Sequence, residues 1–312
     1  MAGGPPILGY FAVWYVINVA YNYTNKKALQ ALPAPYLVAA VQIGAGILYI
    51  LPVWLLGIRA PPNLNRKELL ALLPLGVIHA IGQLVTVLSL GAGSISFVNV
   101  VKSLEPFFNV VFAMVFMRDF VPLPVLLTLV PVVVGVGIAS SADMEFTWLC
   151  FACAMGSNIF FSLRGVLSKV TMKSIRPEAN LGPANLFGVL TIIAFLTALP
   201  IALLMEGATA SRAWDKAIAS GAQPMQLACT IAISGLSFYL YNEVSFLALD
   251  AVDPVTHAVG NTIKRVILIL LSVVAFGTQM TTLSAAGSTI AIIGVFMYSI
   301  AKAKIPAKKK AA

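Results

Sequence analysis

The stretch PVTHAVGNTIKRVILILLSVVAF, residues 254–276, decides the fold. It is long and apolar enough to cross a bilayer as a helix, yet Lys264 and Arg265 stand side by side in its middle. On insertion scales each cation at the bilayer centre costs about 2.5–3.5 kcal/mol, so such residues mark a substrate or ion path. No acidic residue lies beside the pair in the sequence. The stretch therefore predicts a membrane helix that binds an anion.

The composition extends this interpretation to the whole chain. Hydrophobic residues make up 60% of it and charged residues 10%, and the mean hydropathy is +0.94. A soluble domain has about a quarter of its residues charged. The apolar runs predict an all-α membrane protein of ten transmembrane helices. We place them at 9–23, 35–56, 68–90, 94–117, 121–140, 147–168, 185–205, 226–249, 254–276 and 283–301.

Basic residues are distributed unevenly between the two sides of the predicted bundle. An even number of helices puts both termini on one side, where the loops and tail carry most of the Lys and Arg residues. This asymmetry follows the positive-inside rule. The sequence pI of about 9.5 is therefore explained by membrane topology, and we expect a lipid bilayer and no nucleic acid as the macromolecular environment.

Short sequence matches relate the two halves of the chain. Residues 90–92 resemble 249–251, and Gly135-Val136 resembles Gly294-Val295, both at an offset of 159 positions. Five helices in each half would give the halves opposite orientations, the arrangement that many transporters use. We therefore predict two inverted five-helix repeats. The repeat halves are approximately 9–140 and 147–301, within one transmembrane domain whose first six helices occupy 1–168 and whose remainder is 169–312.

Five of the predicted helices carry polar residues at spacings of three or four, which places them on one helix face. Several such faces predict a shared, hydrated cavity. The candidate residues on these faces are His79, Gln83, Thr86, Lys102, Glu105, Phe161, Arg164, Tyr241, His257, Asn261 and Lys264.

The charges inside the predicted spans narrow the ligand class. The cations are Lys102, Arg164, Lys264 and Arg265, and the acids well inside the spans are Glu105 and Glu243. The resulting net charge of +2 matches a phosphate or a phosphate monoester near neutral pH. Arg suits phosphate as a planar fork and Lys as a compact charge. Glu105 follows Lys102 by three residues, so a local ion pair between these two is an alternative.

Four stretches of the sequence carry a family resemblance. They are VVKSLEPFFNVV (100–111), YNEVSFLALDAVDPVTHAVGNTIKRV (241–266), MYSIAKAKI (297–305) and, more weakly, SNIFFSLRGVLSKVTM (157–172). In them the chain resembles the plastidic phosphate translocators of the drug/metabolite transporter superfamily, and its ending is most similar to the triose-phosphate/phosphate branch. The resemblance implies an antiporter of a plastid envelope membrane. It would exchange inorganic phosphate for triose phosphate or 3-phosphoglycerate by alternating access.

The resemblance also implies roles for single residues. Lys102, Lys264 and Arg265 would bind phosphate. The rest of the pocket would be formed by His79, Gln83, Thr86, Phe161, Arg164 and Tyr241, supported by Glu105, Glu243, His257 and Asn261.

Three alternatives stay open at this point. Gln83 stands where many triose-phosphate members have a second His, which leaves a phosphoenolpyruvate/phosphate or other sugar-phosphate translocator possible. The end of the chain, KKAA at 309–312, resembles an ER-retrieval signal and is consistent with a nucleotide-sugar transporter of the ER or Golgi. The membrane concerned is a plastid envelope membrane or an outer membrane of a complex plastid. With two histidines and no metal-ligand spacing, we predict no enzyme activity and no cofactor.

Overall fold

The computed structural model describes residues 7–251 and 254–304, and every regular element in these ranges is helical, as predicted. Two of the elements, η1 (Pro177–Ala179) and η2 (Gly207–Thr209), are short 3₁₀ turns. The α-helices are α1 (Ile7–Ala31), α2 (Pro35–Leu55), α3 (Arg66–Ala92), α4 (Ile95–Lys102), α5 (Glu105–Met117), α6 (Leu123–Leu127), α7 (Val130–Ser141), α8 (Trp148–Met172), α9 (Pro183–Glu206), α10 (Ala210–Ala219), α11 (Pro224–Ala251), α12 (Pro254–Phe276) and α13 (Thr282–Ala303).

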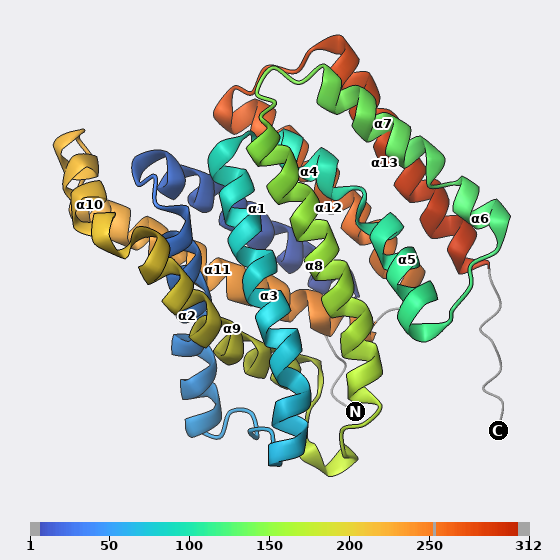
Figure 1. Cartoon of the computed structure of the whole chain (residues 1–312), viewed down its shortest axis with the longest axis horizontal. Helices are drawn as coiled ribbons and strands as arrows, with labels where there is room; N and C mark the ends of the chain where they lie inside the picture. Colours follow the sequence, from blue (N-terminus) through green and yellow to red (C-terminus); the bar gives the residue numbers. More distant parts are fainter. Residues whose placement is uncertain (1–6, 252–253, 305–312) are drawn as a thin grey trace.

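The helices form one elongated bundle with two ends, which we name by their position in Figure 1. At the lower end the α2–α3 and α8–α9 connections meet, and the Asn63 amide donates a hydrogen bond to the Ala179 carbonyl at 2.9 Å. At the upper end the α7–α8 and α12–α13 connections meet, where the Thr281 hydroxyl donates to the Ala142 carbonyl at 2.9 Å. Loops of distant sequence therefore close each end.

Eight segments of the described chain are long and apolar enough to cross a membrane. Three of them join neighbouring elements, at 95–117, 123–141 and 183–219, and the others correspond to α2, α3, α8, α13 and residues 259–276 of α12. The predicted first and eighth spans, which are α1 and α11, are not among the eight. The count of ten therefore stays a prediction.

Side-chain caps explain where several helices begin. Asn65 accepts a hydrogen bond from the Glu68 amide at 2.9 Å, and Glu68 accepts one from the Asn65 amide at 2.9 Å. This capping box satisfies backbone donors at the first turn of α3. Arg176, from the α8–α9 connection, binds the same carboxylate at 2.8 Å, and this hydrogen-bonded pairing raises the pKa of Arg176. The start of α3 is thus tied to the lower end of α8.

The structure corrects three details of the predicted helices. α1 continues to Ala31, beyond the predicted boundary at 23, and α10 occupies part of the stretch predicted as a loop between 206 and 224. The predicted fourth and fifth spans are each divided in two, between Lys102 and Glu105 and between Leu127 and Val130. Both divisions precede a proline, at Pro106 and Pro131.

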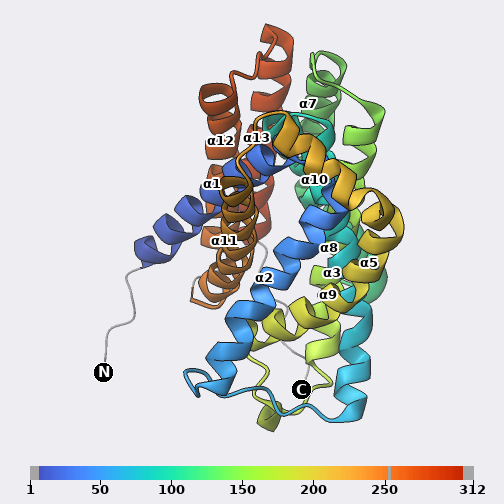
Figure 2. The same cartoon turned by 90° about the vertical axis from the view of Figure 1, so that its left-hand side faces the viewer.

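Packing between the halves of the chain builds the core. The helix pairs between the halves include α1 with α11, α2 with α9, α3 with α8 and with α9, α2 with α11, α5 with α8, α4 with α12 and α7 with α13. Figure 2 shows α11 beside α1 and α2. At the α7–α13 crossing a Cβ placed on Gly287 would lie 2.5 Å from the Ala139 backbone nitrogen. Small residues therefore let these two helices touch through their backbones, as is common in membrane proteins.

Candidate functional site

A broken helix places the first candidate residues. The proline ring at position 106 has no N–H to donate to the Lys102 carbonyl and would clash with it in a continuous helix, so α4 ends at Lys102 and α5 begins at Glu105. The cation therefore stands at the C-terminal end of one helix, where the helix dipole favours positive charge, and the acid in the first turn of the next. α12 packs against α4 and α8 packs against α5, so the break lies inside the bundle.

Three of the predicted cations gather at this break with one acid. Arg265 of α12 donates a hydrogen bond from Nη2 to Oε2 of Glu105 at 2.6 Å, with 5% of Arg265 exposed. Lys102 and Lys264 are half-buried and interact electrostatically with Glu105 and Arg265. We call Lys102, Glu105, Lys264 and Arg265 the charged cluster.

The alternative of a local ion pair between Lys102 and Glu105 is not what the structure contains. Glu105 forms its ion pair with Arg265, while the Lys102 ammonium donates to the Thr86 hydroxyl at 3.3 Å. The Lys264 ammonium lies 4.7 Å from the centre of the Trp14 ring. Each cation therefore has a different neighbour, and Arg265 has the acid that its own helix lacks.

A second group of candidates continues from the charged cluster along α3 and α8. Phe161 lies between two cations, with the Lys102 ammonium 5.1 Å and the Arg164 guanidinium 5.0 Å from its ring centre. Arg164 contacts Nδ1 of the buried His79 at 2.6 Å. We call His79, Phe161 and Arg164 the distal group. It extends the polar site away from the helix break.

The contact with Arg164 determines the tautomer of His79. A guanidinium only donates hydrogen bonds, so Nδ1 accepts and the neutral imidazole carries its proton on Nε2. That Nε2 is buried and has no hydrogen-bond partner among the described residues. The distal group therefore offers a guanidinium and a free N–H donor, the groups that a carboxylate or hydroxyl of a ligand requires.

Aromatic side chains pack around the distal group and form a wall on one side of it. Phe238 stacks on His79 with ring centres 6.1 Å apart, and Phe187 meets His79 edge-on at 5.5 Å. The predicted pocket residue Tyr241 lies 5.8 Å from Phe238 and 5.2 Å from Tyr21. These rings exclude water from one side of the site, which strengthens charge interactions inside it.

Gln83 does not lie on the charged cluster. It is 1% exposed and its amide donates to the Tyr21 hydroxyl at 3.0 Å and, more weakly, to the Gln42 side-chain oxygen at 3.4 Å. Gln42 in turn donates to Asn25 at 2.6 Å and to Ser234 at 2.7 Å. This buried amide network links α1, α2, α3 and α11. Gln83 therefore reaches the pocket through the Tyr21 ring, which contacts Tyr241.

Glu243 forms its ion pair with a residue outside the charged cluster. It is 4% exposed and forms an ion pair with Arg59 of the α2–α3 connection. The sequence count of +2 left Arg59 out because that residue lies outside the predicted spans. When Arg59 and Glu243 are counted as a neutral pair, the described side chains of Lys102, Arg164, Lys264, Arg265 and Glu105 carry a net charge of +3.

Two predicted supporting residues remain. Asn261 lies on α12 one turn before Arg265 and is half-buried. The side chain of His257 lies outside the described residues. Sequence reasoning missed Trp14, Tyr21 and Arg59, since aromatic residues in membrane helices and Arg residues in loops have no spacing that distinguishes ligand neighbours from ordinary packing.

The sequence profile described as the Triose-phosphate Transporter family matches residues 6–299. The chain belongs to this family. It is a family of transporters rather than enzymes.

Several curated relatives are more than one third identical. The chain is 37% identical over 302 residues to a "Triose phosphate/phosphate translocator, non-green plastid, chloroplastic" of Brassica oleracea var. botrytis, covering 96% of this chain and 74% of the relative. It is also 37% identical over 302 residues to "Phosphoenolpyruvate/phosphate translocator 1, chloroplastic" of Oryza sativa subsp. japonica, covering 96% and 73%. A "Triose phosphate/phosphate translocator, chloroplastic" of Flaveria pringlei is 37% identical over 304 residues, covering 96% and 72%.

A protein of known crystal structure has a similar fold. It superimposes with a TM-score of 0.56 at 13% sequence identity, covering 96% of this chain and 99% of the other. The likeness concerns the fold alone.

Proposed function

We propose that this chain is an antiporter that exchanges inorganic phosphate for phosphorylated three-carbon compounds, chiefly triose phosphate and 3-phosphoglycerate. The charged cluster is the observation that carries the proposal. Relatives that are 37% identical are named triose phosphate/phosphate translocators, and the cluster supplies the cations that such substrates need.

Lys102, Lys264 and Arg265 hold the phosphate in this proposal. Arg265 offers a planar fork for two phosphate oxygens, and the two Lys residues add compact charges from α4 and α12. Glu105 balances one positive charge and occupies Arg265 when no anion is bound. A phosphate dianion then competes with a carboxylate already in place, which keeps binding reversible.

The distal group and its aromatic wall select the other end of the substrate. A 3-phosphoglycerate carboxylate would meet the Arg164 guanidinium and the His79 Nε2 donor. Thr86 accepts a hydrogen bond from Lys102, whose ammonium also lies over the Phe161 ring of the distal group, and Tyr241 lines the pocket. Gln83 acts through Tyr21 and the buried amide network rather than by touching the substrate.

Net charge explains why the carrier would exchange and not leak. A site of +3 without its anion is costly to enclose in a low-dielectric interior. A bound dianion removes most of that cost and lets the protein close around it. Only the loaded carrier crosses readily, so an anion must return for each anion that leaves.

The architecture proposed for alternating access is ten helices in two inverted five-helix repeats. α1 and α11 would complete the eight apolar segments, because their 25 and 28 residues are long enough to span. The packing pattern supports the repeat. Exchanging the two halves converts the α1–α11 pair into α8–α3 and leaves the α2–α9, α4–α12 and α7–α13 pairs unchanged.

A plastid envelope membrane is the proposed location, or an outer membrane of a complex plastid. The relatives quoted above are named chloroplastic. The same relatives give less support to the alternative of an ER or Golgi nucleotide-sugar transporter.

Phosphoenolpyruvate exchange is a second candidate function. A relative with this name is as similar to the chain as the triose-phosphate translocators, at 37% identity. Phosphoenolpyruvate also carries a carboxylate for the distal group. It lacks the hydroxyl of 3-phosphoglycerate and carries its phosphate on C2 rather than C3, so competition between the two compounds measures the combined effect of these two differences.

The test is uptake of labelled phosphate into liposomes that contain the purified protein. We expect uptake when the vesicles are loaded with phosphate, triose phosphate or 3-phosphoglycerate, and little uptake when they hold buffer or a nucleotide sugar. Equal uptake into buffer-loaded vesicles would overturn the exchange mechanism. Uptake that depends on a proton or sodium gradient would identify a symporter instead.

A further inference from the structure

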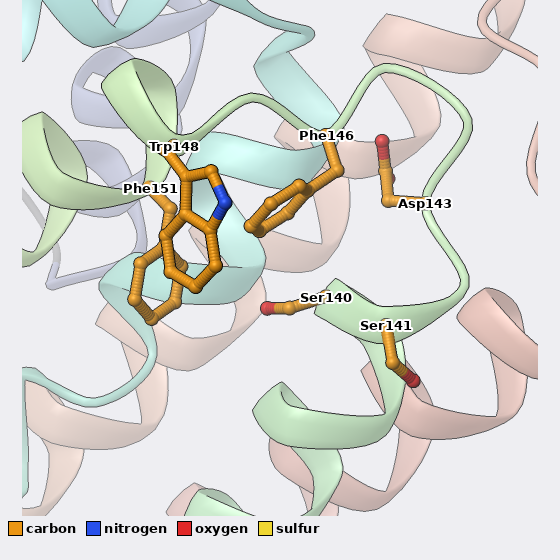
Figure 3. A pocket seen from close by; sticks show the side chains of 6 residues that line it. All are labelled: Ser140, Ser141, Asp143, Phe146, Trp148 and Phe151. Atoms are coloured by element: carbon orange, nitrogen blue, oxygen red, sulfur yellow. The ribbon is translucent and has the colours of Figure 1, made fainter.

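A pocket at the upper end of the bundle lies outside the charged cluster. Its volume is about 500 Å³, and it is bounded by the end of α7, the α7–α8 connection and the first turn of α8. We call it the upper pocket. Figure 3 shows three aromatic rings along one side and polar side chains along the other. The lining residues are Ser140, Ser141, Asp143, Phe146, Trp148 and Phe151.

The Trp148 ring stands nearly at right angles to each of the two Phe rings. Phe146 and Trp148 have ring centres 5.2 Å apart at 80°, and Trp148 and Phe151 have theirs 6.2 Å apart at 88°. Phe146 and Phe151 are 6.0 Å apart at 41°. Rings that meet nearly at right angles form a corner rather than a flat stack. Such a corner attracts a cation where it presents the negative faces of its rings, because the ring edges carry partial positive charge.

Asp143 places a carboxylate on the same pocket. One oxygen accepts the Glu145 amide at 2.9 Å, which fixes the side chain at the start of the turn. The carboxylate of Asp143 is partly buried, and this loss of hydration raises its pKa. Within residues 7–251 and 254–304 it forms no ion pair. Lys26, which interacts electrostatically with Glu145 of the same connection, donates its hydrogen bonds to the Leu90 and Gly93 carbonyls at 2.9 and 2.6 Å.

The pocket lies where lipid head groups would be expected. Ser141 ends one apolar segment and Trp148 begins the next, with 76% of Trp148 exposed. Trp residues at such boundaries sit at head-group depth in a membrane. The Ser140 hydroxyl is buried and has no hydrogen-bond partner among the described residues. A head group that enters the pocket therefore meets a carboxylate, a free hydroxyl and aromatic walls.

We propose that the upper pocket binds the trimethylammonium end of a phosphatidylcholine head group. A quaternary ammonium has no N–H, so it loses no hydrogen bond against aromatic walls and gains from the π faces. A primary ammonium needs acceptors for three N–H groups. Asp143 supplies the opposite charge, but one of its oxygens is already used. The pocket therefore favours the quaternary over the primary ammonium.

The experiment compares lipids that share acyl chains and differ in the head group. The unfolding temperature of the full-length protein is measured in micelles supplemented with phosphatidylcholine, phosphatidylethanolamine or phosphatidic acid, and separately with free choline chloride. A ligand that binds only the folded protein raises apparent stability. We expect the largest rise with phosphatidylcholine, and equal rises with the three lipids would overturn the proposal.

Variants link the effect to the pocket. Asp143→Asn keeps the oxygen that accepts the Glu145 amide and removes the charge, and Trp148→Leu removes one ring. Each should weaken phosphatidylcholine binding about threefold to tenfold. Trp148→Phe keeps an aromatic ring, so it should weaken binding less than Trp148→Leu does. Phe120→Leu removes an aromatic side chain that is 65% exposed and outside the pocket, so it should retain the full lipid difference.

The lipids are compared within each variant, so a general loss of stability lowers all of its unfolding temperatures alike and leaves the difference between lipids unchanged. A lipid difference that persists in both Asp143→Asn and Trp148→Leu would contradict the proposal. Stabilisation by free choline without stabilisation by phosphatidylcholine would assign the pocket to a soluble cation and overturn the lipid assignment. The outcome is independent of transport, so it stands or falls separately from the proposed antiport.

Discussion

Arg265 donates a hydrogen bond to Glu105 at 2.6 Å, although 160 positions separate the two residues in the sequence. The bond joins α12 to the first turn of α5, directly beside the break that follows Lys102. Glu105 keeps 30% of its side chain exposed, whereas Arg265 keeps 6%. The guanidinium is thus held in place by a carboxylate that an arriving anion can replace.

Replacing Arg265 by Lys should damage phosphate recognition even though the charge is kept. The planar fork that binds two oxygens is lost, and we expect the Kd for phosphate to rise about tenfold or more. Phosphate protection against thermal unfolding measures this. Arg212→Lys, an exchange at an exposed position of α10, is the control and should bind normally. Wild-type affinity in Arg265→Lys would rule out direct coordination by Arg265.

Replacing Glu105 by Gln should make stability depend more strongly on phosphate. The change leaves Arg265 buried without its ionic partner, so unfolding should begin at a lower temperature when no phosphate is present. Saturating phosphate should restore most of the loss, because the ligand then supplies the missing negative charge. An equal loss with and without phosphate would show that Glu105 has a purely structural role.

Thr86 should support the Lys102 ammonium through its hydroxyl alone. Thr86→Val keeps the shape and removes the oxygen that accepts from Lys102 at 3.3 Å, so the KM for phosphate should rise about threefold to tenfold. Thr86→Ser retains the oxygen and serves as the matched control. The prediction is measured by initial exchange rates in liposomes, and similar KM values in the two variants would contradict it.

Arg164 should distinguish carboxylated substrates from phosphate. Arg164→Ala removes the guanidinium that contacts His79 at 2.6 Å, and competition by 3-phosphoglycerate and phosphoenolpyruvate should weaken about tenfold. The affinity for inorganic phosphate, which has no distal carboxylate, should change much less. Parallel losses for all three compounds would remove Arg164 from substrate selection.

The sequence predicts much of the fold because apolar runs of bilayer length leave few alternatives to membrane helices. It does not predict the helix breaks. Pro52, Pro74 and Pro200 lie inside continuous helices, whereas Pro106 and Pro131 follow interruptions. Tertiary packing decides which prolines break a helix, and a single sequence does not record that packing.

The candidate site, like the fold, is predictable from the sequence only in part. Lys264 and Arg265 are recognisable from the sequence because unpaired charges in an apolar helix are expensive. Their partners are not recognisable, since Glu105 reaches Arg265 only because α12 packs against α4, beside the break from which α5 begins. The sequence also does not reveal that Glu243, counted among the charges of the site, forms its ion pair with Arg59.

The Arg59–Glu243 pair should contribute to stability rather than to phosphate affinity. Breaking a buried pair costs about 3–5 kcal/mol, and the 28% exposure of the Arg59 side chain reduces our expectation for Glu243→Gln to about 1–3 kcal/mol. Denaturation in detergent measures the loss. Asp215→Asn, an exposed acid on α10, is the control and should lie near wild type.

A double variant separates the pair from its surroundings. Combining Arg59→Gln with Glu243→Gln should cost less than the sum of the two single changes, because no buried charge is then left without a partner. Strict additivity would mean that the ion pair contributes nothing specific.

The α7–α13 crossing should tolerate no side chain at Gly287. A Cβ there would lie 2.5 Å from the Ala139 nitrogen and 2.7 Å from the Gly135 carbonyl oxygen, both backbone atoms that cannot rotate away. Gly287→Ala should therefore push the helices apart and destabilise the protein by about 1–3 kcal/mol.

Gly137 provides the matched control on α7, because a Cβ at that position meets nothing within 4 Å. Gly137→Ala should be neutral or slightly stabilising, since Ala favours a helix more than Gly does. Thermal unfolding of both variants in the same detergent measures the difference, and equal unfolding temperatures would contradict the close backbone contact.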